Sequence, residues 1–334
     1  MMPMLFRSAL GLAVALLAGC GGGSDAPAPT PAPTPPPASV ERDVAPAATD
    51  AAITTDLETH FTINPSPASA ARGRLFVFFP GTGATPANYR LIVRTAATRG
   101  LHSIGLNYPN SLAVASLCNG SADPDCHAKV RNETLLGQDT SQLVTVTPAN
   151  SIVNRLTKLL AYLHARHPAE GWGQYLTNGQ PDWTRIRVAG HSQGGGHAAF
   201  IAKQFAVDRA VYFSSPSDWR DGPNQPATWM GSPGATPAVR QYGFTHLRDP
   251  LVTITVALGN WQALGLAGFG VPVSVDGAAP PYAGSHQLTT DAAPNPAATT
   301  VSPLHGVPVV DAPTPRTASG APLFEPVWIH LCFS

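Results

Sequence analysis

The apolar residues of this chain form short continuous runs that alternate with helical repeats from residue 75 onward. Residues 75–79 are all apolar and end at Pro80-Gly81, which is typical of a strand buried on both faces. We predict further strands over residues 102–107, 185–189, 210–213, 242–247 and 287–290, and helices over residues 86–98, 151–167, 194–205 and 326–331. This alternation predicts an α/β fold, with a mostly parallel central sheet flanked by helices.

The first 19 residues predict an export signal. Arg7 precedes an apolar run over residues 9–17, which is too short to span a bilayer, and small residues follow it. Residues 17–20, Leu-Ala-Gly-Cys, resemble the lipobox of bacterial lipoproteins, in which the cysteine carries the lipid. The resemblance implies a signal peptide over residues 1–19 and lipidation at Cys20. Gly21 after the cysteine resembles outer-membrane sorting in Gram-negative bacteria.

Residues 20–48 are rich in Gly at first and then in Pro, Ala and Thr. Such a segment buries too little apolar surface to offset its ordering entropy, so we predict an extended, membrane-anchored tether. A Pro-rich recognition ligand is the alternative. The remaining residues, 49–334, are enough for one α/β domain.

Charge and cysteine content narrow the function classes. The chain has 20 lysines plus arginines and 20 aspartates plus glutamates, and no basic block occurs. Its charge pattern therefore does not indicate nucleic-acid binding. Cys118 and Cys126 bracket a short polar loop, which predicts a disulfide in an exported protein; two free thiols are the alternative. We expect Cys332 to be buried as a small apolar residue. No paired Cys-x-x-Cys spacing occurs, and we predict no metal site.

The residues with the clearest chemistry are 190–194, Gly-His-Ser-Gln-Gly, between a predicted strand and a predicted helix. Gly190 and Gly194 remove the side chains that would collide on a tight turn there. The turn then presents Ser192 at the carboxyl edge of the sheet, beside a helix N-terminus. A glycine-rich turn in which Ser192 only caps a helix is the alternative.

This motif resembles the nucleophile elbow of α/β-hydrolase esterases and lipases, and the order of elements extends the resemblance over residues 75–331. The resemblance implies an α/β-hydrolase fold with Ser192 as the nucleophile. It also implies an acid and then a histidine, both C-terminal to the serine, on loops that follow later strands.

Residues 79–84 resemble the oxyanion loop of the same family, with Pro80 in the place of the usual histidine. One oxyanion donor would be the backbone N–H of Gln193, which follows the nucleophile. The other would be the N–H of Thr82, with Gly83 as its neighbour. An ordinary turn between strand and helix is the alternative interpretation of this loop.

Two aspartates and two histidines compete for the other catalytic roles. Asp249 lies just past a predicted strand and before Pro250, and we prefer it to Asp218, which follows the preceding strand. His305 lies beyond the last predicted strand of the sheet, and we prefer it to His286.

The sequence therefore predicts an extracytoplasmic serine hydrolase that cleaves carboxylic esters of small molecules or lipids through an acyl-enzyme on Ser192. No cofactor is required by this chemistry. Two other functions remain open: an amidase or peptidase with the same triad, and a non-catalytic surface binding module on the same fold. We expect the domain to be anchored to the cell envelope, at the outer membrane, facing either the periplasm or the surface.

Overall fold

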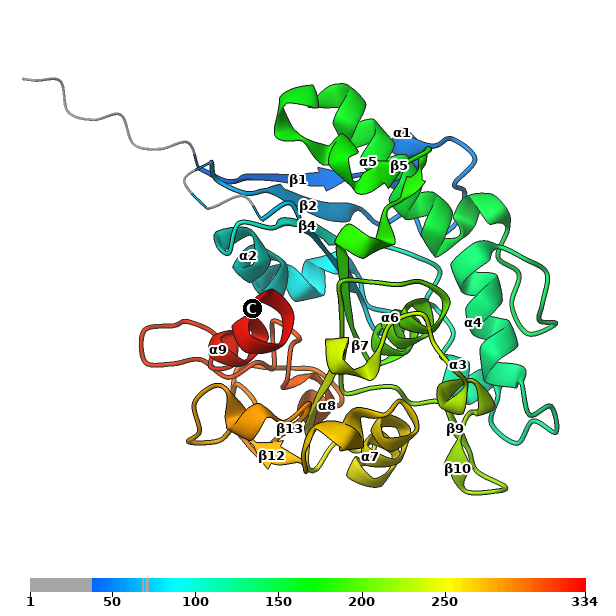
Figure 1. The fold of residues 1–334 in the computed structure, drawn as a ribbon, viewed down its shortest axis with the longest axis vertical. Helices are drawn as coiled ribbons and strands as arrows, with labels where there is room; N and C mark the ends of the chain where they lie inside the picture. Colours follow the sequence, from blue (N-terminus) through cyan, green and yellow to red (C-terminus); the bar gives the residue numbers. More distant parts are fainter. Residues whose placement is uncertain (1–37, 68, 70–71) are drawn as a thin grey trace, which may run out of the picture. The chain divides into compact units, whose positions relative to one another are not determined.

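The computed structural model describes residues 38–67, 69 and 72–334, which belong to one compact unit spanning residues 36–334 (Figure 1). The predicted signal peptide, the lipidation site Cys20 and most of the predicted tether lie outside the described residues. Within the described part of the chain, no helix has the length and apolar character needed to cross a membrane.

A nine-stranded sheet with the order β1-β2-β4-β3-β7-β8-β11-β13-β12 forms the centre of this unit. Strand β2 runs antiparallel to both of its neighbours, β1 and β4, and every other pair in the sheet is parallel. The strands are β1 (Val40–Val44), β2 (His60–Asn64), β3 (Leu75–Phe79), β4 (His102–Gly105), β7 (Ile186–His191), β8 (Arg209–Phe213), β11 (Gln241–His246), β12 (Val273–Ser274) and β13 (Gln287–Thr290). The mostly parallel sheet is confirmed.

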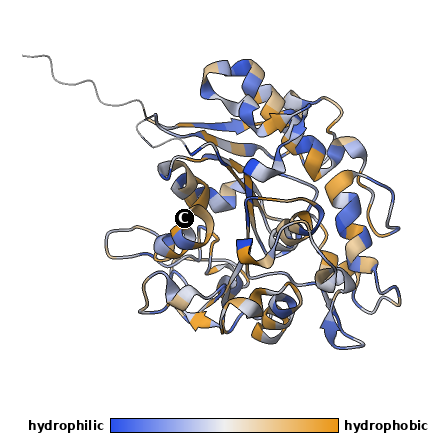
Figure 2. Cartoon of the chain, in the orientation of Figure 1, coloured by the Kyte–Doolittle hydropathy of each residue, from blue (hydrophilic) through white to orange (hydrophobic). Residues whose placement is uncertain are grey.

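Helices cover both faces of the sheet because its central strands are apolar on both sides. All five residues of β3 are buried, and they alternate between two hydrophobic clusters. The first cluster includes residues of α5 (Ile152–Arg166), α6 (Gln193–Gln204) and α7 (Ile254–Ala263). The second includes residues of α2 (Arg90–Thr98) and α9 (Glu325–Trp328). Hydrophobic and hydrophilic residues mix along α5 and along α4 (Cys126–Leu136), as expected of helices at the surface (Figure 2).

The folded part begins earlier than the sequence predicts. The sequence pattern places residues 40–48 in the tether, but Val40–Val44 forms the edge strand β1, and α1 (Pro46–Thr49) follows it. Ion pairs to residues of the rest of the unit hold β1 in place. They are Arg42–Glu170 at 2.6 Å, Asp43–Arg90 at 2.7 Å and Glu41–Arg94 at 2.7 Å.

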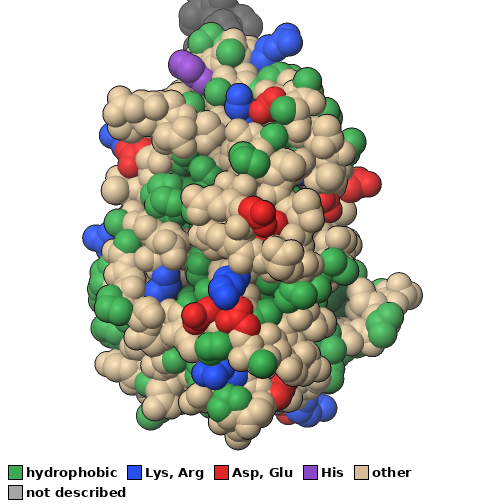
Figure 3. Space-filling model, turned by 90° about the vertical axis from the view of Figure 1, so that its right-hand side faces the viewer, with side chains coloured by type: hydrophobic (Ala, Val, Ile, Leu, Met, Phe, Trp, Pro, Cys, Tyr) green, Lys and Arg blue, Asp and Glu red, His purple; other side chains and the backbone are tan. Residues whose placement is uncertain are grey.

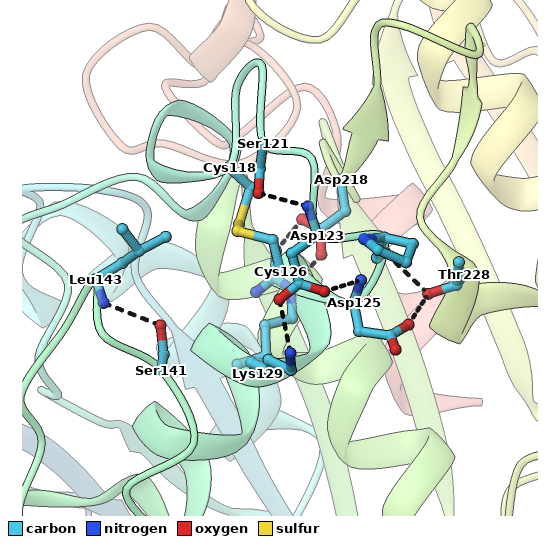
Figure 4. Close-up of a disulfide and its surroundings, with 12 residues drawn as sticks. Cys118, Ser121, Asp123, Asp125, Cys126, Lys129, Ser141, Leu143, Asp218 and Thr228 are labelled. Atoms are coloured by element: carbon cyan, nitrogen blue, oxygen red, sulfur yellow. Dashed lines mark hydrogen bonds and ion pairs between the residues drawn. A yellow bond between two sulfur atoms is a disulfide. The ribbon is translucent and has the colours of Figure 1, made fainter.

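The segment between β4 and α5 contains the predicted cysteine pair. Cys118 follows the short helix α3 (Val114–Leu117), Cys126 begins α4, and their Cα atoms are 5.7 Å apart in a disulfide (Figure 4). The loop between them is closed further by an ion pair of 2.7 Å between Lys129 and Asp123. Cys332 is free and buried, as expected.

Charged side chains of both signs are scattered over the face of the molecule shown in Figure 3, and lysine and arginine do not gather on it. This distribution agrees with the equal numbers of acidic and basic residues, 20 each, in the chain. On this face, a nucleic acid backbone would meet no continuous basic surface.

Candidate active site

Ser192 lies on the turn between β7 and α6 in a strained backbone conformation, with φ 54° and ψ −122°. The turn is possible because its neighbours lack side chains. A Cβ atom on Gly190 would lie 2.3 Å from the carbonyl carbon of Gly194, and one on Gly194 would lie 2.1 Å from the carbonyl oxygen of Phe79. Strand, turn and helix therefore approach as closely as the sequence motif predicts.

The structure brings Asp249 and His305 into contact, although 56 positions separate them in the sequence. Asp249 follows β11, and His305 lies in the short helix α8 (Pro303–Gly306). The distance from His305 Nδ1 to Asp249 Oδ2 is 2.7 Å, while Asp249 Oδ1 accepts from the backbone N–H groups of Leu251 (2.8 Å) and Val252 (3.1 Å).

Two opposing effects act on the pKa of Asp249. Burial raises it, but the hydrogen bond and charge of His305, with the two backbone donors, bring the pKa of Asp249 below its usual value. The carboxylate is therefore ionised at neutral pH. An ionised acceptor fixes the proton of His305 on Nδ1 and leaves Nε2 free to accept a proton.

Ser192 and His305 line the same cleft, which has a volume of about 540 Å³. The hydroxyl of Ser192 and Nε2 of His305 have no hydrogen-bond partner in the part of the chain that the structure describes, so both are open to a ligand. Lysine, arginine, aspartate and glutamate are absent from the described lining. The lining includes small residues and a few aliphatic ones, among them Gly83, Ala84, Ala113, Ala115, Leu251 and Val310.

The loop after β3 lies against this cleft, and one of its backbone N–H groups has no hydrogen-bond acceptor among the described residues. The N–H of Gly81 donates to Tyr89 Oη (3.1 Å), and that of Gly83 donates to the carbonyl of Asn110 (3.0 Å). The N–H of Thr82, between them, makes no hydrogen bond to any described residue. The N–H of Gln193 is in the first turn of α6, where helix geometry leaves it without an intrahelical acceptor.

The Gln193 side chain connects this loop to the nucleophile turn. Its Oε1 accepts from the hydroxyl of Thr82 (3.0 Å) and from the backbone N–H of Val114 (3.1 Å). The two predicted oxyanion residues therefore contact each other, and both belong to segments that border Ser192.

Asp218, the alternative acid, forms an ion pair with an arginine instead of contacting His305. Asp218 is fully buried and forms an ion pair with Arg131 of α4, whose Nε lies 2.6 Å from Asp218 Oδ2. Asp218 Oδ2 also accepts from the indole of Trp229 at 3.0 Å. Burial raises the pKa of Asp218, but the charge of Arg131 and its hydrogen bond lower it below the usual value.

His286, the alternative base, also has partners other than the proposed catalytic residues. Nδ1 of His286 pairs with the carbonyl of Gln241 at 2.9 Å, and its ring stacks on Phe269 with centroids 4.3 Å apart. His286 is not among the residues that line the cleft.

Sequence reasoning missed two residues that support the site. Arg131 Nη1 donates to the carbonyl of Gln193 (3.3 Å), so the buried ion pair also holds the first turn of α6. Asp311 accepts from the backbone N–H groups of Arg90 (2.9 Å) and Leu91 (3.2 Å), which fixes the segment after His305 against α2. No local pattern in the sequence marks either residue, because each acts on a distant element.

Comparison with known proteins adds no relative: no protein-family model matches the chain, and no curated protein is significantly similar to it. Among the described residues, no group of three or more His, Cys, Asp or Glu side chains is arranged to hold a metal ion.

Proposed function

We propose that this chain is a serine hydrolase of the α/β-hydrolase type that cleaves carboxylic esters through an acyl-enzyme on Ser192. The observation that carries the proposal is a shared cleft. A serine on a strained strand-to-helix turn faces it together with a histidine whose other nitrogen is bonded to a buried carboxylate. The chain order Ser192, Asp249, His305 is the order found in α/β-hydrolases.

In the proposed reaction, His305 Nε2 takes the proton of Ser192 as Oγ attacks the ester carbonyl carbon. The negative charge that develops on the carbonyl oxygen is stabilised by the free N–H groups of Thr82 and Gln193. The bond to the leaving oxygen then breaks, and His305 returns the proton to the departing alcohol. Water, deprotonated by the same histidine, releases the acid and restores Ser192.

The test is hydrolysis of p-nitrophenyl esters from acetate to palmitate by the purified full-length protein and its Ser192→Ala variant. We expect turnover by the wild type and none above background in the variant. Ser116→Ala is the matched control, because Ser116 lines the same cleft without a proposed role. An active Ser192→Ala variant would refute the proposal.

A fluorophosphonate probe separates the competing functions. Labelling at Ser192 without turnover of any ester would favour an amidase or peptidase with the same residues. A folded wild type that is neither labelled nor active would instead favour a binding module.

The location of the activity belongs to the same proposal. Lipidation at Cys20 would anchor the domain to the cell envelope, and residues 1–37 lie outside the described structure. A Cys20→Ser variant should lose incorporated lipid. Retention of lipid by that variant would refute the anchor without affecting the hydrolase.

A further inference from the structure

Three hydrogen bonds connect the proposed oxyanion loop to the backbone of His305, the proposed catalytic histidine. The N–H of Gly81 donates to Tyr89 Oη at 3.1 Å, and Tyr89 Oη lies 2.9 Å from His191 Nδ1. On the other side of the imidazole ring, His191 Nε2 lies 3.0 Å from the backbone oxygen of His305. Gly81 and Tyr89 are 8 positions apart, whereas His191 and His305 come from distant parts of the chain.

The donor and the acceptor of each of these three hydrogen bonds can be assigned. A backbone oxygen only accepts, so His191 Nε2 carries the proton that it shares with His305. Burial lowers the pKa of His191 to about 3, and the ring is therefore neutral at physiological pH. With its proton on Nε2, Nδ1 must accept, and the Tyr89 hydroxyl donates to it while accepting from Gly81.

Tyr89 and His191 are buried. In this environment of low dielectric constant, hydrogen bonds are stronger than in water, and a polar group left without its partner destabilises the fold. Tyr89 is 1% exposed and His191 is 5% exposed. Burial also raises the pKa of Tyr89, so the phenol remains protonated and keeps its donor.

The neutral state of His191 has a second consequence for His305. The two imidazole rings have centroids 4.5 Å apart. A positive charge on His191 would repel the imidazolium that forms on His305 during the proposed reaction. Burial holds His191 in the uncharged form and outweighs the hydrogen bond to the His305 backbone oxygen, which on its own would raise the pKa of His191.

The oxyanion loop has little room to shift against these side chains. A Cβ atom on Gly81 would lie 2.9 Å from His191 Nδ1 and 3.3 Å from both Ser192 Cβ and Tyr89 Oη. On the far side of Thr82, the N–H of Gly83 is held by the carbonyl of Asn110 at 3.0 Å. The free amide of Thr82 is thus fixed between two anchored amides.

We propose that Tyr89 and His191 are positioning residues that hold the Thr82 amide and the His305 ring in register across Ser192. This inference rests on the proposed hydrolase function. Neither side chain exchanges a proton with substrate; each acts by fixing the loop or the base. A displacement of either partner by about 1 Å is enough to lower the rate by about 100-fold.

The test compares three substitutions in the full-length protein with p-nitrophenyl butyrate as substrate. Tyr89→Phe removes the hydroxyl and keeps the ring, and His191→Phe keeps a ring without nitrogens. His191→Gln restores one donor and one acceptor. We expect the two Phe variants to lower kcat about 10- to 100-fold while KM changes less than about twofold, and the Gln variant to recover most of the loss.

Tyr212→Phe is the matched control, since Tyr212 is also fully buried and donates a 2.7 Å hydrogen bond, to Gln241 Oε1, outside the cleft. Thermal unfolding of each variant separates loss of fold from loss of rate. A Tyr89→Phe variant whose kcat stays within twofold of the control would overturn the inference. So would a His191→Gln variant as slow as His191→Phe.

The wild type and Ser192→Ala, measured beside these variants, distinguish the two levels of the argument. An active wild type with unaffected Tyr89 and His191 variants leaves the hydrolase in place and removes only the positioning role. A wild type that hydrolyses no ester and takes up no fluorophosphonate removes both.

Discussion

Asp218→Asn should mainly lower the stability of the protein, whereas Asp249→Asn should mainly lower the rate of the proposed hydrolysis. Both aspartates follow strands of the same sheet, and both are buried, Asp218 at 0% and Asp249 at 3% exposure. Their partners differ. Asp218 neutralises a guanidinium that is itself fully buried, whereas Asp249 pairs with a histidine that faces the cleft.

The stability effect of Asp218→Asn follows from the charge it leaves behind. Arg131 would remain buried and cationic without its carboxylate, a situation that destabilises proteins by about 3–5 kcal/mol. With an unfolding entropy of about 2.1 cal/mol/K per residue over roughly 300 residues, this corresponds to a fall in Tm of about 5–8 °C. Because Asp218 does not line the cleft and Arg131 keeps its own donor to the carbonyl of Gln193, we expect kcat to fall less than about tenfold.

Asp249→Asn should have the opposite profile. An asparagine in this position removes the anionic acceptor of His305 and favours the wrong tautomer, an effect of about four orders of magnitude on kcat in serine hydrolases. The assay is thermal unfolding by near-UV circular dichroism beside p-nitrophenyl butyrate kinetics on the same samples.

The control for the pair is Arg131→Met combined with Asp218→Leu, which removes both charges together. We expect this double variant to be more stable than Asp218→Asn alone. The reasoning is refuted if Asp218→Asn melts within about 2 °C of the wild type, or if Asp249→Asn retains more than about a tenth of the wild-type kcat.

Three further predictions concern stability. Serine at both Cys118 and Cys126 should lower the unfolding free energy by about 2–3 kcal/mol from loop entropy, and reductant should lower the Tm of the wild type but not of this variant. Burial lowers the pKa of His60 to about 3 from 6.5, so its contribution is complete above pH 6.5 and lost as the pH falls toward 3. His60→Asn should therefore reduce the slope of unfolding free energy between pH 6 and 4 by about 1.4 kcal/mol per pH unit; an unchanged slope in urea titrations contradicts this. Gly194→Ala should give little folded protein, because its Cβ would lie 2.1 Å from the Phe79 carbonyl; soluble yield at the wild-type level would argue against so tight a turn.

The central strands were predictable because strands buried on both faces carry continuous apolar runs, as in all of β3 and in residues 210–213 of β8. The edge strand β1 was missed since its residues are mainly charged and it directly follows a proline-rich segment. Helix α4 was missed for a different reason. It buries Arg131 and Glu133, and the Glu133 carboxylate accepts from the backbone of Ser141 (2.9 Å) and Val146 (3.0 Å). Polar residues therefore interrupt the apolar positions of its buried face.

In the candidate site, the tight turn that carries Ser192 was predictable because adjacent glycines specify it. The choice between Asp249 and Asp218 was not a local matter. Both sequences read as an aspartate past a strand, and the difference lies in Arg131, which is 87 positions away from Asp218. Likewise, the partners of His191 come from segments that no sequence spacing relates to it.

The cleft draws its walls from segments as far apart in the chain as Gly81 and Pro313. No contiguous fragment of the protein that lacks either end of this span contains them all, so limited proteolysis that releases one end should abolish ester turnover even when the remaining helices persist. During refolding, helical circular dichroism should recover before hydrolysis does. Recovery of the proposed hydrolysis would then report the docking of the last segment, whereas circular dichroism would report the helices.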